Sequence, residues 1–182
     1  MPALGRLSSV DEDQSGSNYR TNFTYDVLGN LVTLTQGTQT RTFAYDSLKR
    51  LTSATNPESG TVSYTYDTNG NMLTRTDARG VTRNNVYDAL NRLTATWFTD
   101  STPAINYGYD SVTRGVGRLA YIYDGGANST TDITGYDALG HPTGRSQKFY
   151  SNSTWQTFNV GYTYDLAGHV KSMTYPSGRT TT

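Results

Sequence analysis

The chain lacks several features that would point to common classes of protein. It has no cysteine, which excludes disulfide bonds and thiolate metal ligands. Fifteen basic residues balance fifteen acidic ones, so the electrostatic footprint of a nucleic-acid-binding protein is missing. Hydrophobic residues make up only 34% of the 182 residues, and no segment is apolar enough to predict a membrane span. We therefore expect no nucleic acid as a partner and no insertion into a membrane.

Threonine, tyrosine and glycine dominate what is present. There are 31 Thr, 15 Tyr and 18 Gly, but only five Pro. Thr and Tyr favour β-strands, and Gly marks turns. No segment sustains the apolar spacing of three and four residues that predicts an amphipathic helix. The composition therefore predicts an all-β fold with little material for a conventional core.

An eleven-residue phrase recurs along the sequence. Residues 25–35 read YDVLGNLVTLT, and residues 45–55 read YDSLKRLTSAT. Seven Tyr-Asp pairs open a copy of this phrase, at Tyr25, Tyr45, Tyr66, Tyr87, Tyr109, Tyr136 and Tyr164, with gaps of 20, 21, 21, 22, 27 and 28 residues. A period near 21 is typical of repeat proteins whose units bury surface only against their neighbours.

The regularity of this period changes along the chain. We expect a single array over residues 1–182, with a partial repeat at 1–24, regular repeats at 25–108 and irregular repeats with insertions at 109–182. The array starts in the middle of a repeat, because LGRL near the start already resembles a repeat's tail. We therefore expect the chain to be a fragment of a longer protein.

Each unit alternates like a strand and then turns. Val62, Tyr64 and Tyr66 fall on one face of a segment with a period of two, which predicts a β-strand. Asp67 can accept hydrogen bonds from backbone N–H groups further round the turn, and Gly70 can take a positive φ. A second strand follows, so each unit is one β-hairpin plus a connecting turn. Seven to eight such units predict 14 to 16 strands.

The motif residues are expected to be structural. The aspartates would lie in a row along one margin of the sheet, as turn caps, and would not converge on one substrate. Lys49 and Asn91 replace the turn glycine, and Lys49 should strain or reshape its turn. The motif set is Tyr25, Asp26, Gly29, Tyr45, Asp46, Tyr66, Asp67, Gly70, Tyr87, Asp88, Tyr109, Asp110, Tyr136, Asp137, Gly140, Tyr164, Asp165 and Gly168.

Signatures of catalysis are missing. The sequence contains no Gly-x-Ser-x-Gly, phosphate loop or zincin motif. His141 and His169 would bind a metal only if a carboxylate joined them, and their spacing is unspecific. We therefore expect no enzyme, no catalytic residue, no cofactor and no bound metal.

The aromatic residues allow two interpretations. Tyr-x-Tyr pairs place rings on one face of the sheet, where they stack on neighbouring strands and stabilise it. Alternatively, exposed rings flanked by Asn, Asp and Arg suit carbohydrate. Four aromatic residues lie outside the motif and are the better candidates for ligand contact: Trp97, Phe98, Trp155 and Phe158.

The pattern Tyr-Asp-x-x-Gly-(Arg/Asn)-Leu-Thr resembles the YD repeats of the Rhs family. It is clearest in YDVLGNLVTLT, and GRL at residues 5–7 and 117–119 reinforces it. The family includes bacterial Rhs polymorphic toxins, the B and C subunits of insecticidal toxin complexes, and the teneurins. The resemblance implies tandem β-hairpins that form one long curved antiparallel sheet, a segment of a spiral shell. In the bacterial members, this shell encloses a C-terminal toxin.

The resemblance also implies a role and partners. The chain lacks the family's capping block with paired aspartates, and it lacks a distinct toxin segment, so we expect shell wall from a secreted or cell-surface bacterial protein. Its partners would be the remaining YD repeats and the toxin cargo of the parent chain. As an alternative, the repeats act as a surface adhesin that binds a glycan or, as in teneurins, a receptor. Unpaired sheet edges also predict edge-to-edge self-association.

Overall fold

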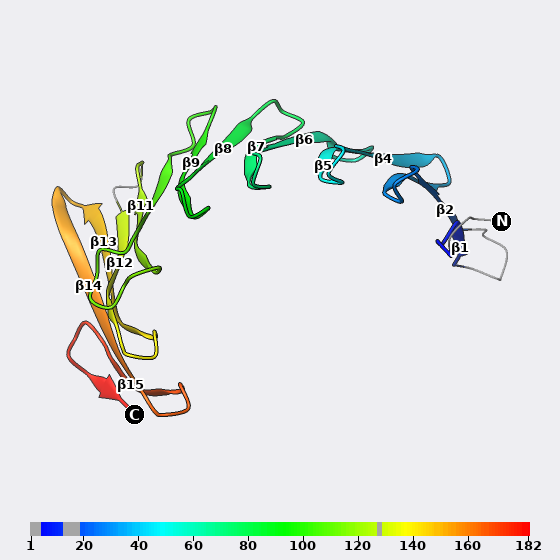
Figure 1. The fold of residues 1–182 in the computed structure, drawn as a ribbon. Coiled ribbons are helices and arrows are strands. Elements are labelled where there is room, and N and C mark those ends of the chain that lie inside the picture. The colour runs from blue at the N-terminus through cyan, green and yellow to red at the C-terminus, as the bar shows by residue number, and fades with distance from the viewer. Residues whose placement is uncertain (1–4, 13–18, 127–128) are drawn as a thin grey trace. The chain divides into compact units, whose positions relative to one another are not determined.

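The computed structural model describes residues 5–12, 19–126 and 129–182, and within these ranges all regular structure is β-strand (Figure 1). The sixteen strands found there are β1 (Ser9–Asp11), β2 (Arg20–Tyr25), β3 (Leu31–Gln36), β4 (Gln39–Tyr45), β5 (Leu51–Asn56), β6 (Gly60–Tyr66), β7 (Met72–Thr76), β8 (Thr82–Tyr87), β9 (Leu93–Phe98), β10 (Ile105–Tyr109), β11 (Leu119–Asp124), β12 (Ser129–Tyr136), β13 (Pro142–Ser151), β14 (Thr154–Tyr164), β15 (Val170–Thr174) and β16 (Thr180–Thr181).

The strands follow the order of the sequence in one sheet, β1 to β16, and the paired neighbours are antiparallel. This arrangement confirms the prediction of an all-β fold of tandem hairpins, with 14 to 16 strands. The chain divides into two compact units, residues 1–84 and residues 85–182, which we describe separately.

Every Tyr-Asp turn in the first unit follows a β-bulge. The register shifts by one residue at Tyr25, Tyr45 and Tyr66, each of which then lies opposite an apolar residue of the next strand. A bulge places two residues of one strand opposite one residue of its partner and increases the local twist. The strand is therefore bent and twisted at each of these tyrosines, directly before the turn.

Two different faces result in the first unit. Along β6, Val62, Tyr64 and Tyr66 are half-buried, whereas Thr61, Ser63 and Thr65 are exposed. This alternation confirms the predicted period of two. We call the side that carries Tyr64 and Tyr66, with its equivalents on neighbouring strands, the tyrosine face, and the opposite side the threonine face.

The threonine face of the first unit is lined by hydroxyl groups. One row runs directly across five successive strands: Thr24, Thr33, Thr42, Thr55 and Thr61. Hydroxyl oxygens of cross-strand neighbours hydrogen-bond, for example at 2.8 Å between Thr55 and Thr61. Such pairs stabilise a sheet by roughly 0.2–1 kcal/mol each relative to alanine.

The second unit has longer strands but no conventional core. β12, β13 and β14 have 8, 10 and 11 residues, compared with five to seven in β2 to β7. Among the described residues of the whole chain, Ala120 and Tyr136 are the only buried hydrophobic side chains. Contacts between neighbouring strands and turns must therefore supply most of the stability.

Candidate functional site

Each Tyr-Asp turn is closed by its own carboxylate. In the third repeat, Oδ1 of Asp67 accepts hydrogen bonds from the backbone N–H groups of Asn69 at 2.9 Å and Asn71 at 2.8 Å. Oδ2 accepts a further bond from the Asn71 side-chain amide at 2.8 Å. The same three bonds recur at Asp26, Asp46, Asp88, Asp137 and Asp165, with Arg or His replacing Asn in several turns.

These bonds keep the carboxylates charged. The hydrogen bond from the Asn71 side chain is the largest influence that lowers the pKa of Asp67. At Asp46, the backbone N–H of Arg50 has the leading part in lowering the pKa. A carboxylate with a lowered pKa that is occupied within its own turn is poorly suited to act as a general acid or base at neutral pH.

The residue four places after Asp reaches the next repeat. Nε of Arg50 donates to Asp46 at 2.7 Å, and Nη1 donates to the backbone carbonyl of Asp67 at 2.7 Å. The guanidinium also lies over the ring of Tyr66, 4.9 Å from the centroid, within the range of a cation–π interaction. Arg50 thus connects its own turn with the turn of the following repeat.

The tyrosine hydroxyls make a second connection between turns. Tyr66 donates to the carbonyl of Leu51 at 2.8 Å, and Leu51 directly follows Arg50. An Arg-Leu pair therefore contacts the next tyrosine twice, on its ring and on its hydroxyl. Equivalent hydroxyl bonds are Tyr25 to Leu7, Tyr109 to Leu93, Tyr136 to Leu119 and Tyr164 to Pro142. Equivalent Arg–Tyr contacts are Arg6 with Tyr25, Arg92 with Tyr109 and Arg118 with Tyr136.

A charge cluster joins the turns of the fourth and fifth repeats. Arg92 donates to Asp88 at 2.7 Å and to both carboxylate oxygens of Asp110, at 3.0 and 2.8 Å. The hydrogen bonds from Arg92 are the first cause of the lowered pKa of Asp110, followed by the backbone N–H of Gly117. In the fifth repeat, the insertion therefore moves the local cap of Asp110 to the N–H of Gly117 and adds a bond to Arg92 of the preceding turn.

Each of the two histidines contacts the aspartate of its own turn. Nδ1 of His141 lies 2.9 Å from Asp137, and Nδ1 of His169 lies 3.2 Å from Asp165. His141 also stacks on Tyr164 with 4.7 Å between ring centroids, in the place that arginine has in other repeats. Within residues 5–12, 19–126 and 129–182, no group of three or more His, Asp and Glu side chains could hold a metal ion.

The turn in which lysine replaces glycine keeps its shape. Lys49 has a φ of 62°, and its N–H still donates to Asp46 O at 3.0 Å, as the N–H of Gly70 does to Asp67 O. Of the two outcomes expected for Lys49, strain or a reshaped turn, the structure shows a strained backbone in an unchanged turn. The Lys49 side chain also donates to the carbonyl of Leu28 at 2.9 Å, in the preceding turn.

The four predicted ligand-contact residues do not form one platform. Trp97 and Phe98 are consecutive on β9 and therefore point to opposite faces. Trp155 and Phe158 also lie on opposite faces, because they are three positions apart on β14. A binding surface formed by all four rings is therefore excluded by the alternation of the strands.

Two aromatic residues that sequence reasoning did not select complete pairs on the β13–β14 hairpin. Phe149 stacks on Phe158 at 5.4 Å between centroids, and Tyr150 meets Trp155 edge-on at 5.6 Å. These four rings are between 37% and 52% exposed. A two-residue hairpin turn at Asn152 and Ser153 places Tyr150 opposite Trp155, so recognition of this turn in the sequence would have indicated the pair.

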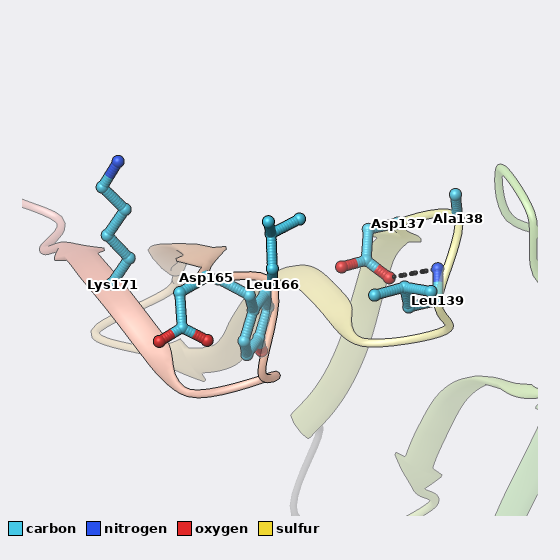
Figure 2. Close-up of a pocket in the computed structure, with 7 residues that line it drawn as sticks. Asp137, Ala138, Leu139, Asp165, Leu166 and Lys171 are labelled. Carbon is cyan, nitrogen blue, oxygen red and sulfur yellow. Dashed lines mark hydrogen bonds between the residues drawn. The ribbon is translucent and has the colours of Figure 1, made fainter.

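A hollow lies between the last two Tyr-Asp turns, and Figure 2 shows its walls. It is lined by Asp137, Ala138, Leu139, Tyr164, Asp165, Leu166 and Lys171. Leu139 is 66% exposed and Leu166 fully exposed, so the walls are largely apolar. Both carboxylates accept hydrogen bonds within their own turns, which makes the hollow unsuited to acid–base chemistry.

Taken together, tandem hairpins joined through Tyr-Asp turns define a YD-repeat protein. The family model of the teneurin YD-shell matches residues 2–180, and the chain belongs to this family. The resemblance to YD repeats of the Rhs type is thereby confirmed.

Solved structures share the fold at low sequence identity. The crystal structure of TcdB2-TccC3 matches with a TM-score of 0.74 and 15% identity, over 87% of this chain and 10% of that chain. TcdB2-TccC3 without its hypervariable C-terminal region matches with a TM-score of 0.70 and 20% identity, over 91% and 10%. The Tc holotoxin pore of Photorhabdus luminescens gives a TM-score of 0.68 and 20% identity, over 86% and 9%.

The chain thus spans about a tenth of the length of the solved chains it matches. No curated protein matches it in sequence. Within the described ranges, no helix has the length and hydropathy needed to span a membrane.

Proposed function

We propose that this chain is a stretch of shell wall, and that in the full-length protein the shell encloses a C-terminal toxin. The observation that carries the proposal is the link from turn to turn. The tyrosine of one repeat is held by the Arg-Leu pair of the repeat before it, as Tyr66 is by Arg50 and Leu51. This contact can be repeated without limit, so a sheet can grow by one hairpin at a time.

The packing supports a wall over a conventional globular domain. The wall of a shell is a single sheet, with one face towards the interior and the other towards the outside. Such a sheet must be stable without a second layer packed against it. Two buried hydrophobic side chains among the described residues are too few for an ordinary core. The turn aspartates are engaged in holding the backbone, which supports a role without catalysis. By analogy with the matched toxin complexes, the parent protein would be a secreted or cell-surface protein of a bacterium.

Limited proteolysis of the full-length protein tests this proposal. A C-terminal domain that resists protease until urea unfolds the repeats would support encapsulation. The matched control is the same C-terminal domain expressed alone, which protease should digest without urea. If the domain in the full-length protein is digested as fast as the isolated one, the wall encloses no cargo and the proposal fails.

A second candidate function is recognition of a receptor or glycan at the cell surface. The Tyr150–Trp155 pair favours it, since Trp155 is 52% exposed on a part of β14 that extends past β15. A glycan array and receptor-binding assays on Trp155→Ala test it, with Trp97→Ala as the control. Binding that only Trp155→Ala removes would contradict a purely architectural role.

A further inference from the structure

The β13–β14 hairpin leaves part of one strand without a neighbour. β14 (Thr154–Tyr164) pairs with β13 from Thr154 to Gly161, but β15 pairs with it only from Gly161 to Tyr164. In the described part of the chain, no backbone hydrogen bond outside the β13 ladder involves residues 154–160. Residues 154–159 are all exposed, and they form an edge of about 20 Å.

The direction of the free backbone groups follows from the hairpin turn. Asn152 and Ser153 have φ of 49° and 63°, which is typical of the two-residue turn that closes on a hydrogen-bonded pair, here Ser151 and Thr154. Hydrogen-bonded and non-bonded pairs then alternate along an antiparallel ladder. The N–H and C=O groups of Trp155, Thr157 and Asn159 therefore point away from β13. The same alternation directs Gly161 towards β15, with which it pairs.

This edge has none of the usual protection. Proteins guard exposed edges with lysine, proline, bulges or a covering segment. Residues 154–159 read TWQTFN, with no charge and no proline, and their pairing with β13 shows no bulge. β15 occupies the neighbouring position and turns back at Tyr175, so no strand of the described residues other than β13 pairs with residues 154–159. The repeat itself therefore does not cover the edge.

Side chains that could bind a partner lie on both sides of the edge. Tyr150 and Trp155 lie on the threonine face, and Phe149 and Phe158 on the tyrosine face. A hollow beside Phe158 extends to the turn between β15 and β16. It is lined by Phe158, Tyr175, Pro176, Ser177, Arg179 and Thr181. Two aromatic rings and one guanidinium group thus form its walls.

We propose that the free edge of β14 binds an extended peptide, which adds as a further strand along residues 154–159. A side chain of the peptide, aromatic or aliphatic, enters the hollow beside Phe158 and Tyr175, and an acidic group of the peptide faces Arg179. In strand addition, main-chain hydrogen bonds supply affinity, and pockets for alternate side chains supply specificity. The proposal depends on β14 and its surroundings and is independent of whether the parent shell encloses a toxin.

A peptide fits this edge better than a sugar or a second copy of the chain. The outward N–H and C=O groups of alternate residues lie about 7 Å apart, which is the spacing of the hydrogen-bonding groups of another extended strand. A sugar would contact the aromatic rings and leave these backbone groups unpaired. A second copy paired through the same edge would leave Arg179 without an acidic partner, because TWQTFN contains none.

The first experiment uses a labelled synthetic peptide, Arg-Thr-Asn-Phe-Thr-Tyr-Asp, which is the sequence of residues 20–26. It has aromatic side chains at alternate positions and an acidic end. Fluorescence anisotropy measures its binding to the 182-residue chain, and amide hydrogen exchange locates it. We expect saturable binding that slows exchange at Trp155, Thr157 and Asn159 and leaves Gln156 unchanged, because the Gln156 N–H faces β13.

Two variants of Thr157 separate strand addition from stacking. Thr157→Pro removes an outward N–H and leaves the β13 ladder intact, since proline is tolerated on edge strands. We expect it to weaken peptide binding by roughly tenfold, whereas Thr157→Val, which keeps the N–H, should bind like the parent chain. Exchange at Gln156 reports whether the hairpin of each variant is still formed.

Arg179→Gln tests the acidic group. It should weaken the peptide that ends in Asp but not the matched peptide that ends in Asn. If the two peptides respond equally, Arg179 does not contact the acid and that part of the proposal is wrong.

Other outcomes would overturn the proposal as a whole. They are the absence of saturable binding, equal binding of a peptide N-methylated at alternate residues, and equal binding to Thr157→Pro. Backbone bonds depend little on the peptide's sequence, so failure of this probe would count against strand addition itself. Glycan binding that requires Trp155 but not the Thr157 N–H would assign the edge to a sugar. A dimer that Thr157→Pro dissociates and the peptide does not would assign it to a second copy.

Discussion

Residues 1–84 and residues 85–182 use the same turn on strands of different length. In the first unit, β2 to β7 are short and the threonine face is an almost continuous array of hydroxyls. In the second, β13 and β14 reach 10 and 11 residues and carry exposed aromatic pairs. The turn-to-turn contact is nevertheless kept, as Tyr164 still donates to Pro142 across 22 residues.

The difference shows which part of a repeat is constrained. A Tyr-Asp turn is closed by hydrogen bonds within five residues, and it contacts the preceding turn at the same margin of the sheet. Extra residues can therefore be added at the opposite margin, where the hairpin tip at Asn152 and Ser153 lies, without disturbing the links between turns. The strands can thus vary while most of the turns keep their form, and the insertion after Asp110 is the exception, because its turn closes on Gly117 and Arg118.

The largest effect is expected at the most buried tyrosine of the second unit. Tyr136 is 9% exposed, and its hydroxyl donates to Leu119 O at 2.6 Å. Tyr136→Ala should lower the free energy of unfolding by about 3 kcal/mol, because it removes a buried ring. Urea unfolding followed by circular dichroism measures the loss. Tyr150→Ala, at a residue that is 48% exposed, is the control and should cost far less. Equal losses would show that burial at the turns does not govern stability.

The second effect is a loss of stability in acid. The pKa values of eight aspartates are lowered in the folded chain: Asp26, Asp46, Asp67, Asp77, Asp88, Asp110, Asp137 and Asp165. A depressed folded pKa contributes stability that is present above the unfolded value, about 3.9, and is lost as the pH falls through the folded value. Chemical unfolding between pH 6 and pH 2 should show stability that falls below about pH 4.

A variant locates this acid effect in one turn. Asp67→Asn should flatten the acid dependence, because one of the carboxylates that must be protonated is gone. Glu58→Gln, at an acid outside the Tyr-Asp turns, should change the slope less. An acid dependence that does not change in Asp67→Asn would place its origin outside the turn caps.

A smaller effect is expected from one hydroxyl in the first unit. Tyr66→Phe removes the bond to Leu51 O and keeps the ring under Arg50, so we expect a loss of about 1 kcal/mol. Tyr64→Phe is the matched control on the same strand, since the Tyr64 hydroxyl has no hydrogen-bond partner among the described residues. Thermal unfolding compares the two. If both variants melt alike, the hydroxyl link between turns contributes little.

The smallest effect compares the two turns that lack glycine. Lys49 in the first unit has a φ of 62° and Asn91 in the second a φ of 60°. Lys49→Gly should raise the free energy of unfolding by about 0.5 kcal/mol, because relief of the strained φ outweighs the lost bond to Leu28 O. Asn91→Gly should gain less, since asparagine tolerates this region better. A larger gain at Asn91 would contradict this account of the strain.

Much of the fold was predictable because the repeat is local. The alternation around Tyr64 and Tyr66 indicated a strand, and Asp67 with Gly70 indicated the turn, since both depend on residues close in sequence. The role of Arg50 was not predicted. Its contact with Tyr66 crosses from one repeat to the next, and the sequence pattern alone gives no distance between them.

The sequence by itself determined the strands, the turns and the family, because hydrogen bonds within five residues and a period of two do not depend on distant contacts. Only the tertiary structure decided which side chains meet. Strand alternation separated Trp155 from Phe158, and pairing across the hairpin joined them to Tyr150 and Phe149 instead. The early end of β15 then left one edge of β14 open, because the lengths of neighbouring strands, which no single repeat encodes, decide which backbone groups are paired.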